Sequence, residues 1–170
     1  PGFVTVDGIN VGKQSGGGVF AYSSQTVFKN VNIEKNVCAG GDDFFGNGGG
    51  VYAGVSQLTF EDSRIAENAS ERVPGKSGGT SGALFVFGTE STRASLDMKN
   101  VTIETNSAMS LGGAMYIIGY TDVNFEDVHF IENEAQGAGG AIRIDGASAT
   151  DYNNFNMQGG SFVGNSAVGT

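Results

Sequence analysis

Few side chains in this chain have the type and spacing that catalysis or metal binding requires. Asp42 and Asp43 stand side by side in a glycine-rich stretch, and clustered carboxylates can act as acid and base or bind Ca²⁺. The neighbouring Phe44, Phe45 and glycines favour a surface loop instead. Ca²⁺ at such acidic loops is the one cofactor that the sequence leaves open, and we otherwise expect none.

The other candidates for chemistry are isolated. Arg143 and Asp145 are two residues apart, so they share one face of a strand and we expect them to pair with each other. His129 is the only histidine, and one histidine does not make a metal site. Cys38 is the only cysteine, which excludes a disulfide within the chain. We therefore expect no catalytic residues and no metal ligands.

The charge balance narrows the range of partners. The 170 residues include 9 Lys and Arg against 18 Asp and Glu, for a net charge of −9. Such an acidic chain is a poor match for nucleic acid. No apolar run approaches the ~20 residues of a membrane-spanning helix, so we expect no membrane insertion of this segment.

A repeated sequence pattern predicts the secondary-structure elements that position these candidate residues. An aromatic residue or Met is followed by Ile or Phe and then by Asn, and a glycine pair and an apolar stretch lie upstream. Apolar residues alternate with polar ones, as in Leu58-Thr59-Phe60, which is the period of a strand. This pattern predicts an all-β fold, a parallel β-helix solenoid with about three short strands per coil and five to six coils. The five copies cover 28–36, 60–68, 98–106, 125–133 and 157–165.

We expect one β-helix segment over 1–170, an excerpt of a longer repeat protein, with a partial coil at 1–15. The repeats are then 16–47, 48–80, 81–111, 112–138 and 139–170. The spacing of the copies places long corner loops at 37–47, 69–80, 88–95 and 146–153.

Stacking of coils predicts columns of equivalent residues. Two inward columns contain Phe28, Phe60, Met98, Phe125 and Met157, and Ile33, Ile65, Ile103, Phe130 and Phe162. A third inward column contains Phe20, Tyr52, Leu84, Met115 and Ile142. An exposed column of alternating charge contains Lys29, Glu61, Lys99 and Glu126.

Polar columns are expected at the corners. The last residue of each copy is Asn, which tolerates the left-handed backbone conformation and can form hydrogen bonds between stacked coils. This column contains Asn36, Asn68, Asn106, Asn133 and Asn165. A second turn column contains Asn30, Asp62, Asn100, Asp127 and Gly159.

The third inward column implies an outer face of small and apolar residues, and such faces are seldom left bare. Either a long corner loop folds over this face or another chain docks on it. The candidate interface residues are Val51, Ala53, Ala83, Phe85, Ala114, Tyr116 and Arg143. Two sequons, at Asn68 and Asn100, are candidate glycosylation sites because both asparagines lie in expected turns.

The repeat resembles that of the polymorphic membrane proteins, the autotransporter adhesins of chlamydiae. The shared features are Gly139-Gly140-Ala141-Ile142 and the Phe-x-x-Asn motifs at 130–133 and 162–165. The resemblance covers about residues 16–170. It implies a right-handed parallel β-helix and a secreted or surface-displayed passenger that adheres to another surface, and it carries over no catalytic motif.

We therefore expect an extracellular or cell-surface structural or adhesive module, a subunit or segment of a surface fibre, without catalytic activity. Its partners are then copies of itself, neighbouring domains of the same protein, or a surface glycan or receptor. The alternative is a carbohydrate-active β-helix enzyme, a polysaccharide lyase or glycoside hydrolase acting on an acidic polysaccharide. An ice-binding solenoid requires flat ranks of Thr, and the outward columns hold too few.

Overall fold

The computed structural model describes residues 4–10, 16–40, 46–72, 79–146 and 152–169. These residues form strands and their connections, with no helix among them, so none of them belongs to a helix that could cross a membrane. Every strand pairing in this part of the chain is parallel. The expected all-β fold with parallel sheets is therefore confirmed.

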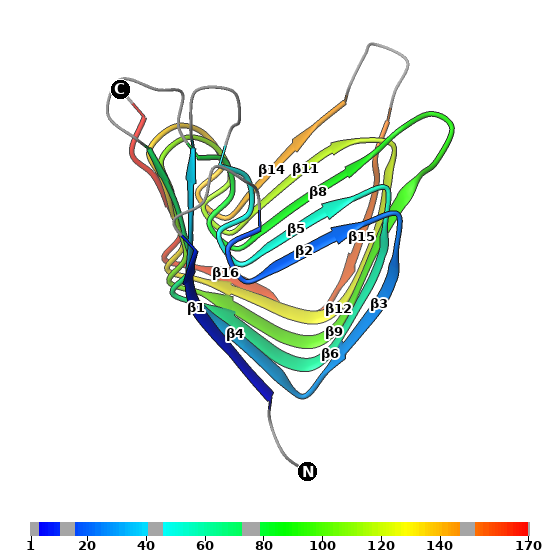
Figure 1. Ribbon diagram of the computed structural model, residues 1–170, viewed down its shortest axis with the longest axis horizontal. Coiled ribbons are helices and arrows are strands. Elements are labelled where there is room, and N and C mark those ends of the chain that lie inside the picture. The colour runs from blue at the N-terminus through cyan, green and yellow to red at the C-terminus, as the bar shows by residue number, and fades with distance from the viewer. Residues whose placement is uncertain (1–3, 11–15, 41–45, 73–78, 147–151, 170) are drawn as a thin grey trace.

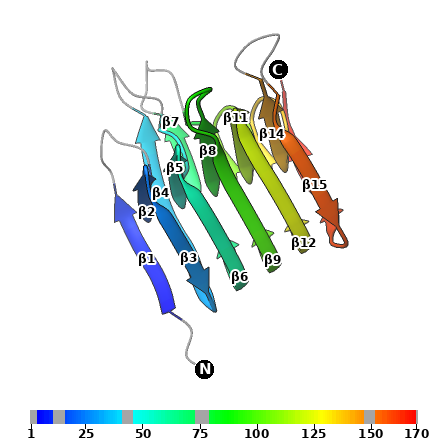
Figure 2. The same cartoon turned by 90° about the vertical axis from the view of Figure 1, so that its right-hand side faces the viewer.

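The strands form two sheets, and each repeat contributes to both (Figure 1). Equivalent strands of successive repeats lie side by side (Figure 2). The smaller sheet contains β2 (Val19–Tyr22), β5 (Val51–Gly54), β8 (Leu84–Gly88), β11 (Met115–Gly119) and β14 (Ile142–Asp145). The larger sheet contains β1 (Val4–Asn10), β3 (Gln25–Lys29), β4 (Val31–Gly40), β6 (Gln57–Ala66), β9 (Ala94–Glu104), β12 (Thr121–Ile131), β15 (Asn154–Gln158) and β16 (Ser161–Val163), together with four short strands described below.

The larger sheet bends along the second predicted turn column. Its residues have left-handed φ angles, 47° at Asp62, 53° at Asn100 and 54° at Asp127, and short polar side chains accept this conformation at low cost. In β6, β9 and β12 the strand continues through the bend. Two of the three expected strands are therefore one bent strand in these repeats, and they are separate only at Asn30 and Gly159.

A fourth short strand follows each corner asparagine, which the sequence pattern did not predict. These strands are β7 (Ala69–Arg72), β10 (Ser107–Ala108), β13 (Glu134–Ala135) and β17 (Ser166–Ala167), and β4 itself runs on to Gly40. The expected corner loops at 37–47 and 69–80 therefore begin with paired strand, in the register Val37 to Ala69. The pairing persists because the asparagines fix the backbone register just before it.

The asparagine column is confirmed as a hydrogen-bonded ladder. The Nδ2 of each asparagine donates to the Oδ1 of the asparagine in the next repeat, at 2.9 Å from Asn36 to Asn68, 3.0 Å from Asn68 to Asn106, 2.9 Å from Asn106 to Asn133 and 2.8 Å from Asn133 to Asn165. The backbone N–H of each rung donates to the same oxygen, at 2.9–3.1 Å. All these bonds point the same way along the stack.

The asparagines themselves are not the left-handed residues, contrary to expectation. The residue before each asparagine has the positive φ, as at Glu67 (54°), Thr105 (53°) and Glu132 (51°). That preceding turn directs the asparagine side chain inward, where Asn106 is 1% exposed and donates to the carbonyl oxygens of Ile65 and Glu104. The ladder is thus a buried column of hydrogen-bonded amides.

The two columns of large apolar residues are confirmed as core. Phe28, Phe60, Met98, Phe125 and Met157 are in register, and so are Ile33, Ile65, Ile103, Phe130 and Phe162. Phe60, Ile103 and Phe130 are completely buried. Phe162, in the last repeat, remains 53% exposed because no further described strand covers it.

The third predicted inward column is wrong by one residue in the first two repeats. Val51, not Tyr52, pairs with Leu84, and Tyr52 pairs with Phe85. The sequence has three consecutive glycines at 16–18 and 48–50 where later repeats have two small residues and Ala, so a glycine pair can be aligned in two ways. The inward residues are Val19, Val51, Leu84, Met115 and Ile142.

One glycine column is required by the close approach of successive repeats. A Cβ at Gly82 would lie 2.3 Å from the carbonyl oxygen of Gly113, and a Cβ at Gly113 would lie 2.1 Å from that of Gly140. Gly17 and Gly49 have the same contact, at 2.2 and 2.3 Å. Only glycine lets the backbones come this close at the corner that leads into the smaller sheet.

Candidate functional site

The outer face of the smaller sheet is aromatic. Of the predicted interface residues, Phe85, Tyr116 and Arg143 lie in its outward column, in register with Phe20 and Tyr52. The expectation that Val51, Ala53, Ala83 and Ala114 also face outward is wrong, since all four are completely buried. We call this outward surface the aromatic face, and it consists of Phe20, Tyr22, Tyr52, Phe85, Phe87, Tyr116 and Ile118.

The rings of the aromatic face stack along the direction in which the repeats stack. Phe20 and Tyr52 have centroids 4.9 Å apart and planes 3° apart, and Tyr52 and Phe85 have centroids 5.4 Å apart and planes 9° apart. Tyr116 meets Phe85 edge to face at 5.5 Å. Because the stacked rings cover one another's faces, they present mainly their edges to solvent.

A glycine makes room for the second row of rings. A Cβ at Gly54 would lie 2.5 Å from the Cε1 of Phe87 and 2.8 Å from the Cδ2 of Tyr22. The rings of Tyr22 and Phe87 therefore approach each other above Gly54, with centroids 6.5 Å apart. The rings of β2, β5 and β8 thus form one contiguous cluster, in which Phe85 is buried by its neighbours.

The aromatic face ends in a polar cluster at β14. The Nε of Arg143 donates to Asp145 Oδ1 at 2.7 Å, so the predicted pairing of these residues is confirmed. The hydroxyl of Tyr116 donates to Asp145 Oδ2 at 2.9 Å. Burial, and then the bond to Asp145, raises the pKa of Tyr116 to about 12. Burial also raises the pKa of Tyr52.

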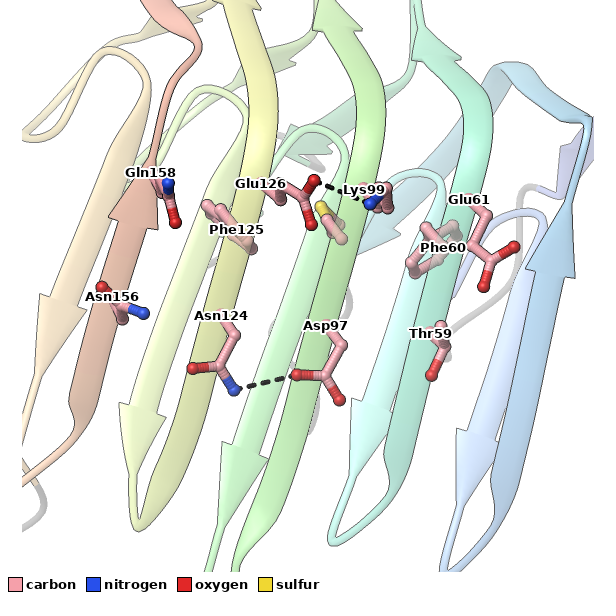
Figure 3. A pocket seen from close by; sticks show the side chains of 11 residues that line it. Thr59, Phe60, Glu61, Asp97, Lys99, Asn124, Phe125, Glu126, Asn156 and Gln158 are labelled. Carbon is pink, nitrogen blue, oxygen red and sulfur yellow. Dashed lines mark hydrogen bonds and ion pairs between the residues drawn. The ribbon is translucent and has the colours of Figure 1, made fainter.

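A second site lies on the outer face of the larger sheet, where a hollow of about 350 Å³ crosses β6, β9, β12 and β15 (Figure 3). Two rows of polar side chains border it. One row lies at the position just before Phe60, Met98 and Phe125 in their strands, and the other lies at the position just after. We call this hollow the polar groove. The first row is Thr59, Asp97, Asn124 and Asn156, and the second row is Glu61, Lys99, Glu126 and Gln158.

The second row is the predicted column of alternating charge. Lys29 Nζ lies 2.5 Å from Glu61 Oε2, and Lys99 Nζ lies 2.7 Å from Glu126 Oε1. These hydrogen bonds raise the pKa of both lysines. The predicted register is therefore confirmed, and the charges of this row pair between neighbouring strands.

The first row was not predicted. Its residues occupy the position just before each aromatic residue or Met of the repeat, and their types differ from copy to copy. Asn124 Nδ2 donates to Asp97 Oδ1 at 2.9 Å. Thr59 and Asn156 make no side-chain hydrogen bond within the part of the chain that the structure describes. Reading this column across the aligned copies would have revealed four polar residues in a line.

Past the bend, one arginine joins three strands. Arg64 donates to Glu34 at 2.7 Å and to Glu104 at 2.6 Å. His129 lies in the same outward column, as predicted, and its Nδ1 is 2.9 Å from Ser161 Oγ. Its Nε2 is 3.3 Å from Asp127 Oδ1. The bonds of Arg64 and His129 to these four residues are ordinary contacts between side chains on the surface of a sheet.

The remaining sequence candidates have different outcomes. Cys38 is buried, and burial raises the pKa of its thiol to about 11. Asp42 and Asp43 lie outside the described residues. Within the described ranges, no three His, Cys, Asp or Glu side chains come together in a way that could hold a metal ion.

The two sequons differ sharply in exposure. The expectation that Asn68 is accessible is wrong, because its side chain is a rung of the ladder and is 1% exposed. Asn100 lies in the exposed turn, where its Nδ2 donates to Asp62 Oδ1 at 2.8 Å. Glycosylation at Asn100 stays a prediction.

Comparisons with protein-family models, with curated proteins and with solved structures find no match for this chain.

Proposed function

We propose that this chain is a right-handed parallel β-helix module that serves a structural or adhesive role at a cell surface or outside the cell, without catalysis. The aromatic face is the observation that carries the proposal. Phe20 is 59% exposed and Tyr22 is 56% exposed, whereas Tyr52, Phe87 and Tyr116 are half-buried and Phe85 is 8% exposed. Aromatic side chains left exposed at the surface are typical of protein contact sites.

The charge of the aromatic face supports a contact role. The chain carries a net charge of −9, which opposes close approach of a second copy or of another acidic surface. Among the outward positions of the smaller sheet, the only charged residues are Arg143 and Asp145, and they pair with each other. This face therefore adds no unpaired charge of its own to that repulsion.

The repeat supports the proposed fold and location. The parallel pairing of each repeat with the next is compatible with a β-helix, and crossovers between parallel strands are right-handed in almost all proteins. The resemblance of the repeat to polymorphic membrane proteins favours display outside the cell.

The proposal is tested with beads coated with the full chain. Bead clustering measures self-association, and bead attachment to cultured cells measures adhesion. The double variant Phe20→Lys/Tyr22→Lys places two charges on the aromatic face, and we expect it to lose clustering, attachment or both while the circular dichroism spectrum stays unchanged.

The matched control is Val27→Lys, because Val27 is 62% exposed but lies on the larger sheet. This variant is expected to behave as the parent. If the parent beads neither cluster nor attach, or if the double variant retains both properties, the aromatic face is not a contact surface and the proposal fails.

A further inference from the structure

The geometry points to a second binding site, in the polar groove, for a neutral linear glycan. This site is on a different sheet from the aromatic face and does not depend on the function proposed above. Its two rows consist of eight hydrogen-bonding side chains, at two successive outward positions on each of four strands (Figure 3). The strand backbones between the rows form an open floor.

The side chains of the groove have hydrogen-bonding capacity to spare. Asp97 and Asn124 are joined by one hydrogen bond, so Asp97 Oδ2 and Asn124 Oδ1 can still accept hydrogen bonds from a ligand. Thr59, Asn156 and Gln158 make no side-chain bonds among the described residues. Carboxylates and carboxamides each present two polar atoms in one plane, so they can bind two neighbouring hydroxyl groups of a sugar at once.

The spacing of the rows suits a polymer. Neighbouring strands lie about 4.8 Å apart, and the rows repeat once per strand across β6, β9, β12 and β15. An extended β-linked polysaccharide advances by one sugar over a similar distance. Such a chain lying along the stack would present equivalent hydroxyl groups to each strand in turn.

The charge of the groove selects against acidic polymers. Glu61, Asp97 and Glu126 supply three carboxylates, and Lys99 supplies one ammonium group. A chain of uronic acids or sulfated sugars would meet like charge here. The ligand is therefore a glycan without carboxylate or sulfate groups, which differs from the acidic polysaccharide considered as an enzyme substrate.

A basic peptide fits the groove less well than a sugar chain. Glu61 and Glu126 already pair with Lys29 and Lys99, which lowers the gain from new ion pairs. β6, β9 and β12 are each paired on both sides, so among the described strands of the groove only the outer edge of β15 is open to the main chain of a peptide. Hydroxyl groups need only the side chains that the groove presents.

The test is titration calorimetry of the full chain with β-linked hexamers of glucose, xylose and mannose, with oligogalacturonate and oligolysine as charged comparisons. We expect at least one neutral hexamer to bind with a Kd of about 1 mM or below. The double variant Asp97→Ala/Asn124→Ala removes the centre of the first row. It is expected to weaken binding about tenfold or more.

The matched control is Thr102→Ala, which also changes an outward residue of β9 but lies past the bend. Binding by this control is expected to equal that of the parent. The inference is overturned if no neutral hexamer binds, if only oligolysine or oligogalacturonate binds, or if the double variant binds as tightly as the parent. Unchanged circular dichroism of the double variant shows that it folds.

Discussion

Each asparagine of the ladder holds three stretches of backbone together. Asn106 donates to Asn133 and to the carbonyl oxygens of Ile65 and Glu104, and it accepts two bonds from Asn68. Because the site is buried, loss of this side chain leaves donors of Asn68 without a partner. Buried polar groups in that state are costly, and neighbouring bonds of a chain reinforce one another.

We expect Asn106→Ala to lower the free energy of unfolding by about 3 kcal/mol or more, from one to three unsatisfied buried groups. Urea denaturation followed by circular dichroism measures the loss. Asn154→Ala is the control, since Asn154 is exposed and donates only to Asp122. Equal stability of the two variants would show that the ladder adds little.

Tyr116 is expected to ionise at a higher pH than a tyrosine side chain in water. Its folded pKa of about 12 is above the ordinary value near 10, so the fold favours the neutral phenol. The stability from this group is fully present below about pH 10 and is lost as the pH rises through 12. The difference in ultraviolet phenolate absorbance between the parent and Tyr116→Phe measures the titration of this phenol. A variant curve identical to the parent at high pH would contradict this assignment.

At the scale of elements, the glycine column decides whether one repeat can stack on the next. A Cβ at Gly82 would also lie 2.6 Å from the backbone nitrogen of Ser107, so two neighbouring segments would have to move. We expect Gly82→Ala to cost more than about 3 kcal/mol or to prevent folding, because the obstacle is backbone and not a side chain that can turn away.

The control for this change is Gly169→Ala. A Cβ at Gly169 meets only Gly137, at 3.6 Å, and Gly169 has no positive φ. Thermal unfolding of the two variants separates a general glycine effect from a packing effect. If both variants melt at the temperature of the parent, the corner tolerates a side chain and the close approach is not required.

The elements that the sequence predicted well are those with contrasting side chains. Phe60 and Asn68 could be aligned across copies because an aromatic core residue and a buried amide are not interchangeable. A run of identical glycines can be aligned in more than one way, and the sequence pattern therefore predicts Tyr52 in the core although Val51 occupies that position. The short strand at Ser107 has two residues and no alternation to read, and it exists only because the ladder precedes it.

At the scale of the whole molecule, the middle repeats are covered on both sides and the last is covered on one side among the described strands. β9 pairs with both β6 and β12, whereas β15 pairs with β12 alone. We expect the amide hydrogens of β9 to exchange with solvent more slowly than those of β15 and β16. Hydrogen exchange read by mass spectrometry measures the difference, and uniform exchange would indicate a single cooperative unit.

The polar groove shows what the sequence alone left out at this scale. Thr59, Asp97, Asn124 and Asn156 are separated by tens of residues, and the aligned copies put them in one column that the register of four strands turns into a row. Each is an ordinary surface residue in its own strand. The site is a property of the stack and not of any one repeat.

The direction of strand pairing also determines how the protein would respond to mechanical load. The strands run across the stack, and the hydrogen bonds between repeats run along it. A force that pulls the first and last repeats apart therefore breaks the hydrogen bonds between two neighbouring repeats one after another, and does not break them all at once by shear. Rupture would therefore proceed by peeling at low force, one repeat at a time. Each step would release the 27–38 residues between successive asparagines, or roughly 90–135 Å of extended chain. A stack of repeats loaded in this way would lengthen gradually under tension and absorb work before it broke.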